Sequence, residues 1–208
     1  MIGSRLPTIQ YGLIAVVALS VPLSGWGATY PPNTWLQLGP VVLLMLLAPA
    51  LLRRWPLSTA SVVAIAAFLL LHDLAARWTY SDVPYDAWGR TLTGASIDQL
   101  CGFTRNQFDR LVHGMFGVLA ILPTSEAVRR YAGLGRRAAL SFALMFVLAV
   151  GGVYEIFEWL LAVFMDPASA EAYNGQQGDM FDAQKDMAIA AVGGLLSTAW
   201  IGLRHACR

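Results

Sequence analysis

GQQGDMFDAQKDM, residues 175–187, runs directly into the apolar stretch AIAAVGGLLSTAWIGL, residues 188–203, and this junction decides the fold. Asp179, Asp182 and Asp186 are spaced so that, at about 100° per residue, they fall within roughly 60° of one helix face. Ionised side chains at the end of a membrane span are costly and are usually kept for a functional reason. The junction therefore predicts a transmembrane helix that begins with an acidic face.

The composition of the whole chain indicates a membrane protein. Of its 208 residues, 57% are hydrophobic and only 13% are charged, which is too apolar for an ordinary soluble domain. We expect one transmembrane domain over residues 1–208 with the lipid bilayer as its surroundings. The net charge of +1 and the lack of a basic stripe exclude nucleic acid as a partner.

Apolar runs separated by polar, Pro-containing or Gly-containing connections predict an all-α fold with about six transmembrane helices. A long outer loop would join the third and fourth spans. The first run has an alternative interpretation as a cleaved signal peptide, with a weak cleavage site among the small residues 25–28. The predicted spans are residues 9–25, 35–52, 56–74, 106–122, 138–164 and 183–203.

Basic residues gather at one side of these spans, and the positive-inside rule then predicts that both termini are cytoplasmic in a multi-pass protein of the bacterial inner membrane. All acidic residues except Glu126 fall at or near the outer face. Cys101 and Cys207 would lie on opposite sides, which disfavours a disulfide between them and excludes a zinc–thiolate site. The basic residues are Arg5, Arg53, Arg54, Arg129, Arg130, Arg136, Arg137, Arg204 and Arg208.

Helix rise places several polar side chains at one depth. Glu155 lies roughly 27 Å beyond Arg137 at 1.5 Å per residue, in the outer part of a core about 30 Å thick. Asp109 and His113 begin a helix that enters from outside, and the 179–186 aspartates do the same. His72 and Asp73 end a helix that leaves outward. We therefore expect four helices to bring polar groups to a common outer level.

Each of these groups also has a purely structural interpretation. Asp109 and His113 share a helix face, as metal ligands or an acid–base pair would, but a local structural bond has the same spacing. For Glu155 and Glu158, which lie in an otherwise apolar segment, the structural alternative is ion pairing with arginine. Arg110 and Lys185 are best interpreted as counter-ions, and the role of His72 with Asp73 stays open.

A charge count favours a bound cation as one solution. Six helix-borne carboxylates face three cations (Arg105, Arg110 and Lys185), and the excess negative charge has to be met by protonation, water or a bound cation. Oxygen ligands with imidazole suit Zn, Mn, Mg or Ca. The predicted metal ligands are Asp109, His113, Glu155, Glu158, Asp179, Asp182 and Asp186.

Five segments resemble the YjdF-like bacterial inner-membrane proteins, a family of unknown function. They are TYSDVP (79–84), FTRNQFDRLVHGMFG (103–117), Glu126, YEIFEW (154–159) and QGDMFDAQKDM (177–187). The resemblance implies a multispanning inner-membrane protein and puts Tyr80, Asn106 and Gln177 at motif positions. A more distant likeness to the VanZ-like membrane proteins, associated with glycopeptide resistance, favours an envelope-lipid or cell-wall setting.

The leading functional hypothesis is a metal site near the periplasmic face that performs hydrolysis or transfer on a lipid-linked or phosphorylated envelope substrate. Asp109, His113 and Glu158 would be catalytic. An alternative is an ion- or proton-coupled transporter that uses the same carboxylates. A third is a non-catalytic partner subunit whose polar cluster holds its helices together. The predicted substrate-binding residues are Arg105, Asn106, Tyr80 and Gln177.

Overall fold

The computed structural model describes residues 5–204, and Cys207 lies outside this range. Within it the chain is helical and has no strand, and six helices are long and apolar enough to cross a membrane, which confirms the predicted fold class. The long helices are α1 (Thr8–Gly25), α2 (Pro31–Arg54), α3 (Thr59–Ala76), α6 (Phe108–Tyr131), α7 (Arg136–Phe164) and α9 (Asp182–Arg204). The short ones are α4 (Tyr85–Thr93), α5 (Ile97–Cys101) and α8 (Pro167–Asn174).

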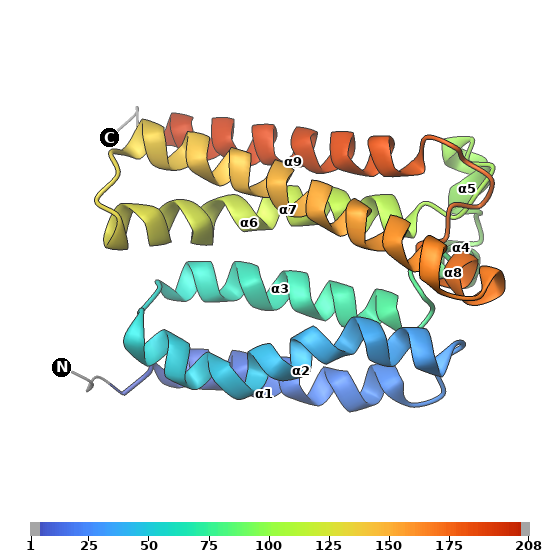
Figure 1. The fold of residues 1–208 in the computed structure, drawn as a ribbon, viewed down its shortest axis with the longest axis horizontal. Coiled ribbons are helices and arrows are strands. Elements are labelled where there is room, and N and C mark those ends of the chain that lie inside the picture. Colours follow the sequence, from blue (N-terminus) through green and yellow to red (C-terminus); the bar gives the residue numbers. More distant parts are fainter. Residues whose placement is uncertain (1–4, 205–208) are drawn as a thin grey trace.

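The long helices form two groups that meet where α3 packs on α6 (Figure 1). One group is α1, α2 and α3, with a core that includes Val17 and Leu38; the other is α6, α7 and α9, with a core that includes Ile121 and Val147. Phe68 and Phe116 join the groups, with ring centroids 5.4 Å apart. The short helices α4, α5 and α8 all lie at the end of the bundle where α6 and α9 begin (Figure 1).

Helices α6 and α9 approach so closely that their backbones touch. A Cβ atom on Gly117 would overlap with the carbonyl oxygen of Ala190, and one on Gly193 would overlap with that of Gly114. Small residues allow this kind of approach between membrane helices, where packing replaces the hydrophobic effect as the driving force. This contact sets the spacing between the α6 and α9 side chains at the end where both helices begin.

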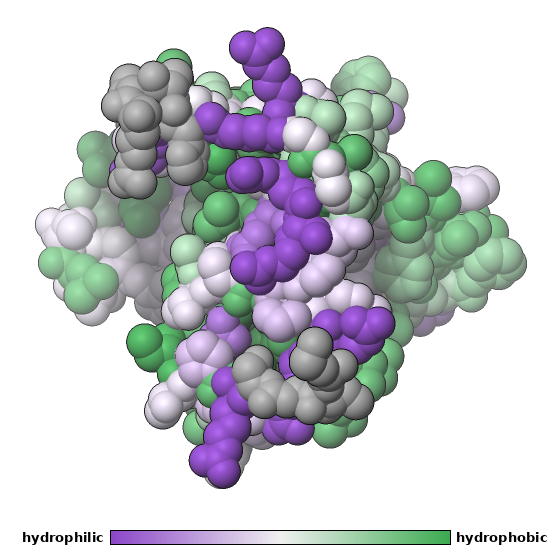
Figure 2. Space-filling view, turned by 90° about the vertical axis from the view of Figure 1, so that its left-hand side faces the viewer, coloured by the Kyte–Doolittle hydropathy of each residue, from purple (hydrophilic) through white to green (hydrophobic). Residues whose placement is uncertain are grey.

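Charge is segregated between the two ends of the bundle. The end where α1 begins and α9 ends, here called the arginine-rich end, carries hydrophilic side chains across its surface (Figure 2). The opposite end, where α6 and α9 begin, is here called the acidic end. The arginine-rich end comprises Arg53, Arg54, Arg129, Arg130, Arg136, Arg137 and Arg204. That this end faces the cytoplasm stays a prediction from the positive-inside rule.

Helix α6 is longer than the apolar pattern indicates. The predicted span stops at residue 122, but the helix continues through Pro123 to Tyr131, so Arg129 and Arg130 lie in its last turn instead of a loop. The added segment has a structural use, because the Glu126 carboxylate accepts hydrogen bonds from the Ser58 backbone N–H (2.7 Å) and from the Ser58 and Ser61 hydroxyls (2.6 and 2.5 Å). These contacts hold the N-terminus of α3 against α6.

Candidate functional site

The acidic junction quoted above is helical only in part. Gln177 and Gly178 have positive φ values of 50° and 78°, so the backbone turns there and α9 begins at Asp182. Asp179 lies before the helix, where its Oδ1 accepts a hydrogen bond from the Phe181 N–H at 3.1 Å. The expectation that three aspartates share one helix face is therefore wrong for Asp179, whose side chain binds the backbone of the turn.

Asp179 and Asp182 lie in a network of ion pairs with three cations. Arg110 Nη2 is 2.6 Å from Asp179 Oδ2, and Lys185 Nζ is 2.5 Å from the same oxygen. Arg105 Nη1 is 2.5 Å from Asp182 Oδ1, which Arg110 Nη2 also approaches at 3.3 Å. Hydrogen bonds from Lys185 and from the Phe181 N–H lower the pKa of Asp179 to about 2. Both aspartates are therefore supplied with counter-charge by the protein itself.

The predicted substrate-binding residues lie in contacts that join the outer segments. Arg105 Nη1 donates to the Gln176 carbonyl oxygen at 2.9 Å. The Gln177 side chain forms two hydrogen bonds with the Asn106 backbone: its Oε1 accepts from the N–H at 3.0 Å, and its Nε2 donates to the carbonyl oxygen at 3.2 Å. Tyr80 is hydrogen-bonded to His72. These four residues tie residues 105–107 to residues 175–177 and close the loop after α3, and their role in substrate binding stays a prediction.

Beneath this network, α6 and α9 form an acid–histidine cluster of Asp109, His113 and Asp186. One potential ligand atom from each residue lies within 4.8 Å of the others. His113 Nε2 is 3.5 Å from Asp109 Oδ1 and 3.9 Å from Glu155 Oε1 on α7. None of the four side chains belongs to a residue that is more than 9% exposed. The structure thus brings together carboxylates and imidazole from three of the helices that carry predicted site residues.

Some atoms of the cluster lack a hydrogen-bond partner within residues 5–204. Asp186 Oδ1 and Glu155 Oε1 are buried without a partner, although Arg110 Nε lies 3.9 Å from Asp186 Oδ1. A buried carboxylate oxygen normally has at least one hydrogen bond, and leaving it without one is costly. Arg105, Arg110 and Lys185 are engaged mainly with Asp179 and Asp182, so they leave these two carboxylate oxygens without a hydrogen bond.

Two predicted groups lie outside the cluster. Glu158 is half-buried on α7, and its backbone carbonyl oxygen accepts a hydrogen bond from Asn174 at 3.0 Å. Asp73 is directed toward α1, where it accepts a 2.5 Å hydrogen bond from Ser20. The His72 ring contacts the Gln37 carbonyl oxygen at 3.1 Å. The expected fourth contributor, the end of α3, therefore makes separate contacts within its own group of helices.

Sequence reasoning did not single out Tyr154 or the α6–α9 glycines. The Tyr154 ring lies edge-on to the His113 ring, with centroids 6.0 Å apart, and so covers the imidazole from α7. Tyr154 lies one helical turn before Glu158 in the YEIFEW segment, and this spacing could have been used to predict that it lies near the site. Gly114, Gly117 and Gly193 are small residues of the kind that close helix pairs use at their contacts.

The fold and the cluster define a class: an all-helical, multi-pass inner-membrane protein with a buried acid–histidine group near one end of its bundle. Residues 9–207 match the family described as "Predicted membrane protein (DUF2238)", and the chain belongs to that family. It is 30% identical over 177 residues to the inner membrane protein YjdF of Escherichia coli K12, which covers 84% of this chain and 80% of the relative. No solved structure matches it. The first resemblance is thereby confirmed, and the VanZ-like one stays a prediction.

Proposed function

We propose that the protein binds a divalent metal ion through Asp109, His113 and Asp186, with Glu155 as a further ligand. The observation that carries this proposal is the pair of buried carboxylate oxygens, Asp186 Oδ1 and Glu155 Oε1, that have no hydrogen-bond partner within residues 5–204. A bound cation would satisfy both oxygens and offset the excess negative charge. Asp179 and Asp182 are left out of the proposed ligand set because arginine and lysine already neutralise them.

The spacing of the ligand atoms supports an ion of ordinary size. Two ligands on opposite sides of Zn²⁺ or Mg²⁺, each about 2.1 Å away, would be about 4.2 Å apart, and Ca²⁺ at about 2.5 Å would separate them by about 5 Å. One atom each of Asp109, His113 and Asp186 lies within 4.8 Å of the others, so a single ion of this size could contact all three residues.

The chemistry that such a site would supply is metal-assisted hydrolysis or transfer on a lipid-linked or phosphorylated substrate. A bound metal polarises a phosphoryl or carbonyl oxygen and lowers the pKa of a bound water. Glu158, one turn beyond Glu155 on α7, is the remaining acidic group on that helix for a general-base role. The positive-inside prediction would open the site to the periplasm.

The transporter alternative is supported less well by the arrangement of charges. Proton or ion coupling normally needs ionisable groups along a path through the bundle. Glu126 is the acidic residue at the arginine-rich end, and its carboxylate is occupied by Ser58 and Ser61 at the start of α3. We therefore give preference to a site confined to the acidic end.

Metal analysis of the purified full-length protein tests the proposal. We expect about one divalent ion per chain, strongly reduced in Asp186→Asn and His113→Gln and unchanged in the control Asp82→Asn, an exposed acid of the outer loop. Unchanged metal content in the two cluster variants would overturn the metal site. An enzyme would also turn over its substrate in detergent, whereas a transporter would need a sealed vesicle and a gradient.

A further inference from the structure

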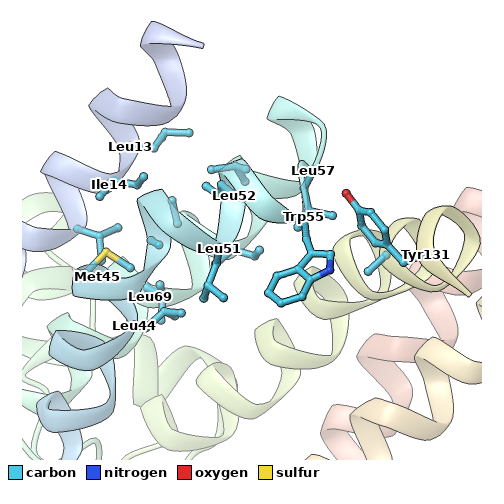
Figure 3. Close-up of a pocket in the computed structure, with 16 residues that line it drawn as sticks. Leu13, Ile14, Leu44, Met45, Leu51, Leu52, Trp55, Leu57, Leu69 and Tyr131 are labelled. Carbon is cyan, nitrogen blue, oxygen red and sulfur yellow. The ribbon is translucent and has the colours of Figure 1, made fainter. Parts of the chain in front are cut away.

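An apolar pocket lies away from the acidic cluster, among α1, α2, α3 and α6. Its volume is about 320 Å³, which is at the lower end of the range for small-ligand pockets, about 300–1,000 Å³. Leu13, Ile14 and Met45 lie at one end, and Trp55, Leu57 and Tyr131 at the other (Figure 3). The pocket is lined almost entirely by hydrocarbon, so it fits an apolar ligand.

The pocket is long enough to extend along one leaflet of a membrane. On α2 its lining runs from Leu44 to Leu52 and then to Trp55, a rise of about 16 Å at 1.5 Å per residue. That rise is about half of a hydrocarbon core of about 30 Å. Walls that face an empty space lose dispersion contacts, and the molecules beside a membrane-embedded groove are phospholipids. An acyl chain is therefore the occupant that this shape and position favour.

Two arginines, Arg53 and Arg54, form the end of α2 between the lining residues Leu52 and Trp55. Arg53 donates to the Tyr11 hydroxyl at 2.9 Å, and the Arg54 guanidinium lies 5.1 Å from the centroid of the Trp55 ring. Among residues 5–204 neither forms an ion pair, whereas Arg130 on α6 is paired with Glu126 at 3.4 Å. The end of α2 thus carries two positive charges without an ion-pair partner among residues 5–204, next in sequence to residues that line the apolar pocket.

We propose that this pocket is a binding site for an anionic phospholipid of the leaflet at the arginine-rich end. One acyl chain fills the slot between α2 and α3, and Arg53 and Arg54 hold the phosphate group of the lipid. Trp55 and Tyr131 lie between these two regions, at the level where aromatic side chains contact the headgroup boundary. The site does not depend on metal binding at the acidic end.

Photolabelling of the full-length protein tests this site. Phosphatidylglycerol and phosphatidylcholine, each with a diazirine in the acyl chain, would be compared in detergent micelles at equal concentration. We expect phosphatidylglycerol to label the Leu44–Leu52 segment more strongly. Replacing both arginines, in Arg53→Gln with Arg54→Gln, should reduce that labelling by about fivefold for each arginine removed.

Two further variants distinguish a specific lipid-binding site from general attraction between the protein surface and lipids. Arg137→Gln removes an exposed arginine from the same end of the bundle but away from the pocket, and it should leave labelling unchanged. Ala127→Phe fills the pocket from α6 and should reduce labelling by both lipids. Equal labelling by the two lipids, or an equal loss in Arg137→Gln, would show ordinary boundary lipid and overturn the proposal.

Discussion

Gly193 of α9 lies directly against the backbone of Gly114 on α6, with no space for a Cβ atom on Gly193. His113 is the residue next to Gly114, and Asp186 lies two helical turns before Gly193 on α9. The distance between these two cluster members is therefore controlled by a backbone contact and does not depend on the length of any side chain between the helices.

Gly193→Ala should destabilise the protein by about 1–3 kcal/mol, because the added methyl group has to push the two helices apart. Gly12→Ala is the matched control, since a Cβ atom there would meet nothing within 4 Å. Thermal unfolding in detergent measures both variants. An unfolding temperature that is equal for Gly193→Ala and Gly12→Ala would show that α6 and α9 are less tightly packed than described.

Arg105→Lys keeps the charge but loses the forked guanidinium that binds Asp182 and the Gln176 carbonyl oxygen together. We expect residues 175–181 to exchange amide hydrogens faster, by about tenfold if one charge-assisted hydrogen bond of about 1.4 kcal/mol is lost. Arg90→Lys is the control, because Arg90 forms an exposed pair with Asp86 on α4. No change in exchange would mean that Arg105 does not hold this segment.

Asp109→Asn separates a metal site from a cluster that only holds helices together. In the wild-type protein, a metal at 100 times its Kd should stabilise the fold by about 2.7 kcal/mol. The variant should lose this gain, while its metal-free form stays as stable as wild type or becomes more so, because one of several crowded carboxylates is removed. A strongly destabilised metal-free variant would instead favour the partner-subunit interpretation.

Low pH should destabilise the turn before α9. The pKa of Asp179 is lowered to about 2, so its ionised form is favoured by folding, and its contribution is fully present above the ordinary value of about 3.9. The contribution is lost as the pH falls through this range toward 2. Asp179→Asn should therefore show a smaller loss of stability between pH 5 and pH 2.5 than wild type. Parallel pH profiles would contradict the assignment of that loss to Asp179.

The six long helices were predictable because their apolar runs are long and are separated by proline, glycine or charge. The end of α6 was not, because Pro123 and Glu126 look like a helix end in the sequence. In the structure Glu126 is compensated by Ser58 and Ser61 of another helix, and no local pattern reveals that contact.

For the candidate site, the sequence predicted the position of the polar residues along their helices but not the direction in which each side chain points. Helix rise placed the polar residues of α6, α7 and α9 at the same level. In the structure, His113 lies close to both Asp109 and Glu155. The side-chain direction of Asp73 depends on its contact with Ser20, and that of Asp179 depends on the turn at Gly178. Residue spacing predicts neither direction, because one depends on a tertiary contact and the other on the backbone dihedral angles of a turn.

The Glu126 contact also bears on the order in which the protein is assembled. Ser58 and Glu126 are 68 positions apart in the sequence. The start of α3 is therefore synthesised well before Glu126, whose carboxylate accepts the hydrogen bond from the Ser58 N–H. Until α6 has been inserted, water or lipid headgroups have to accept the hydrogen bond from that N–H group. The start of α3 therefore gains these contacts only after the fourth long helix has been made, and a chain stopped before residue 126 would lack them.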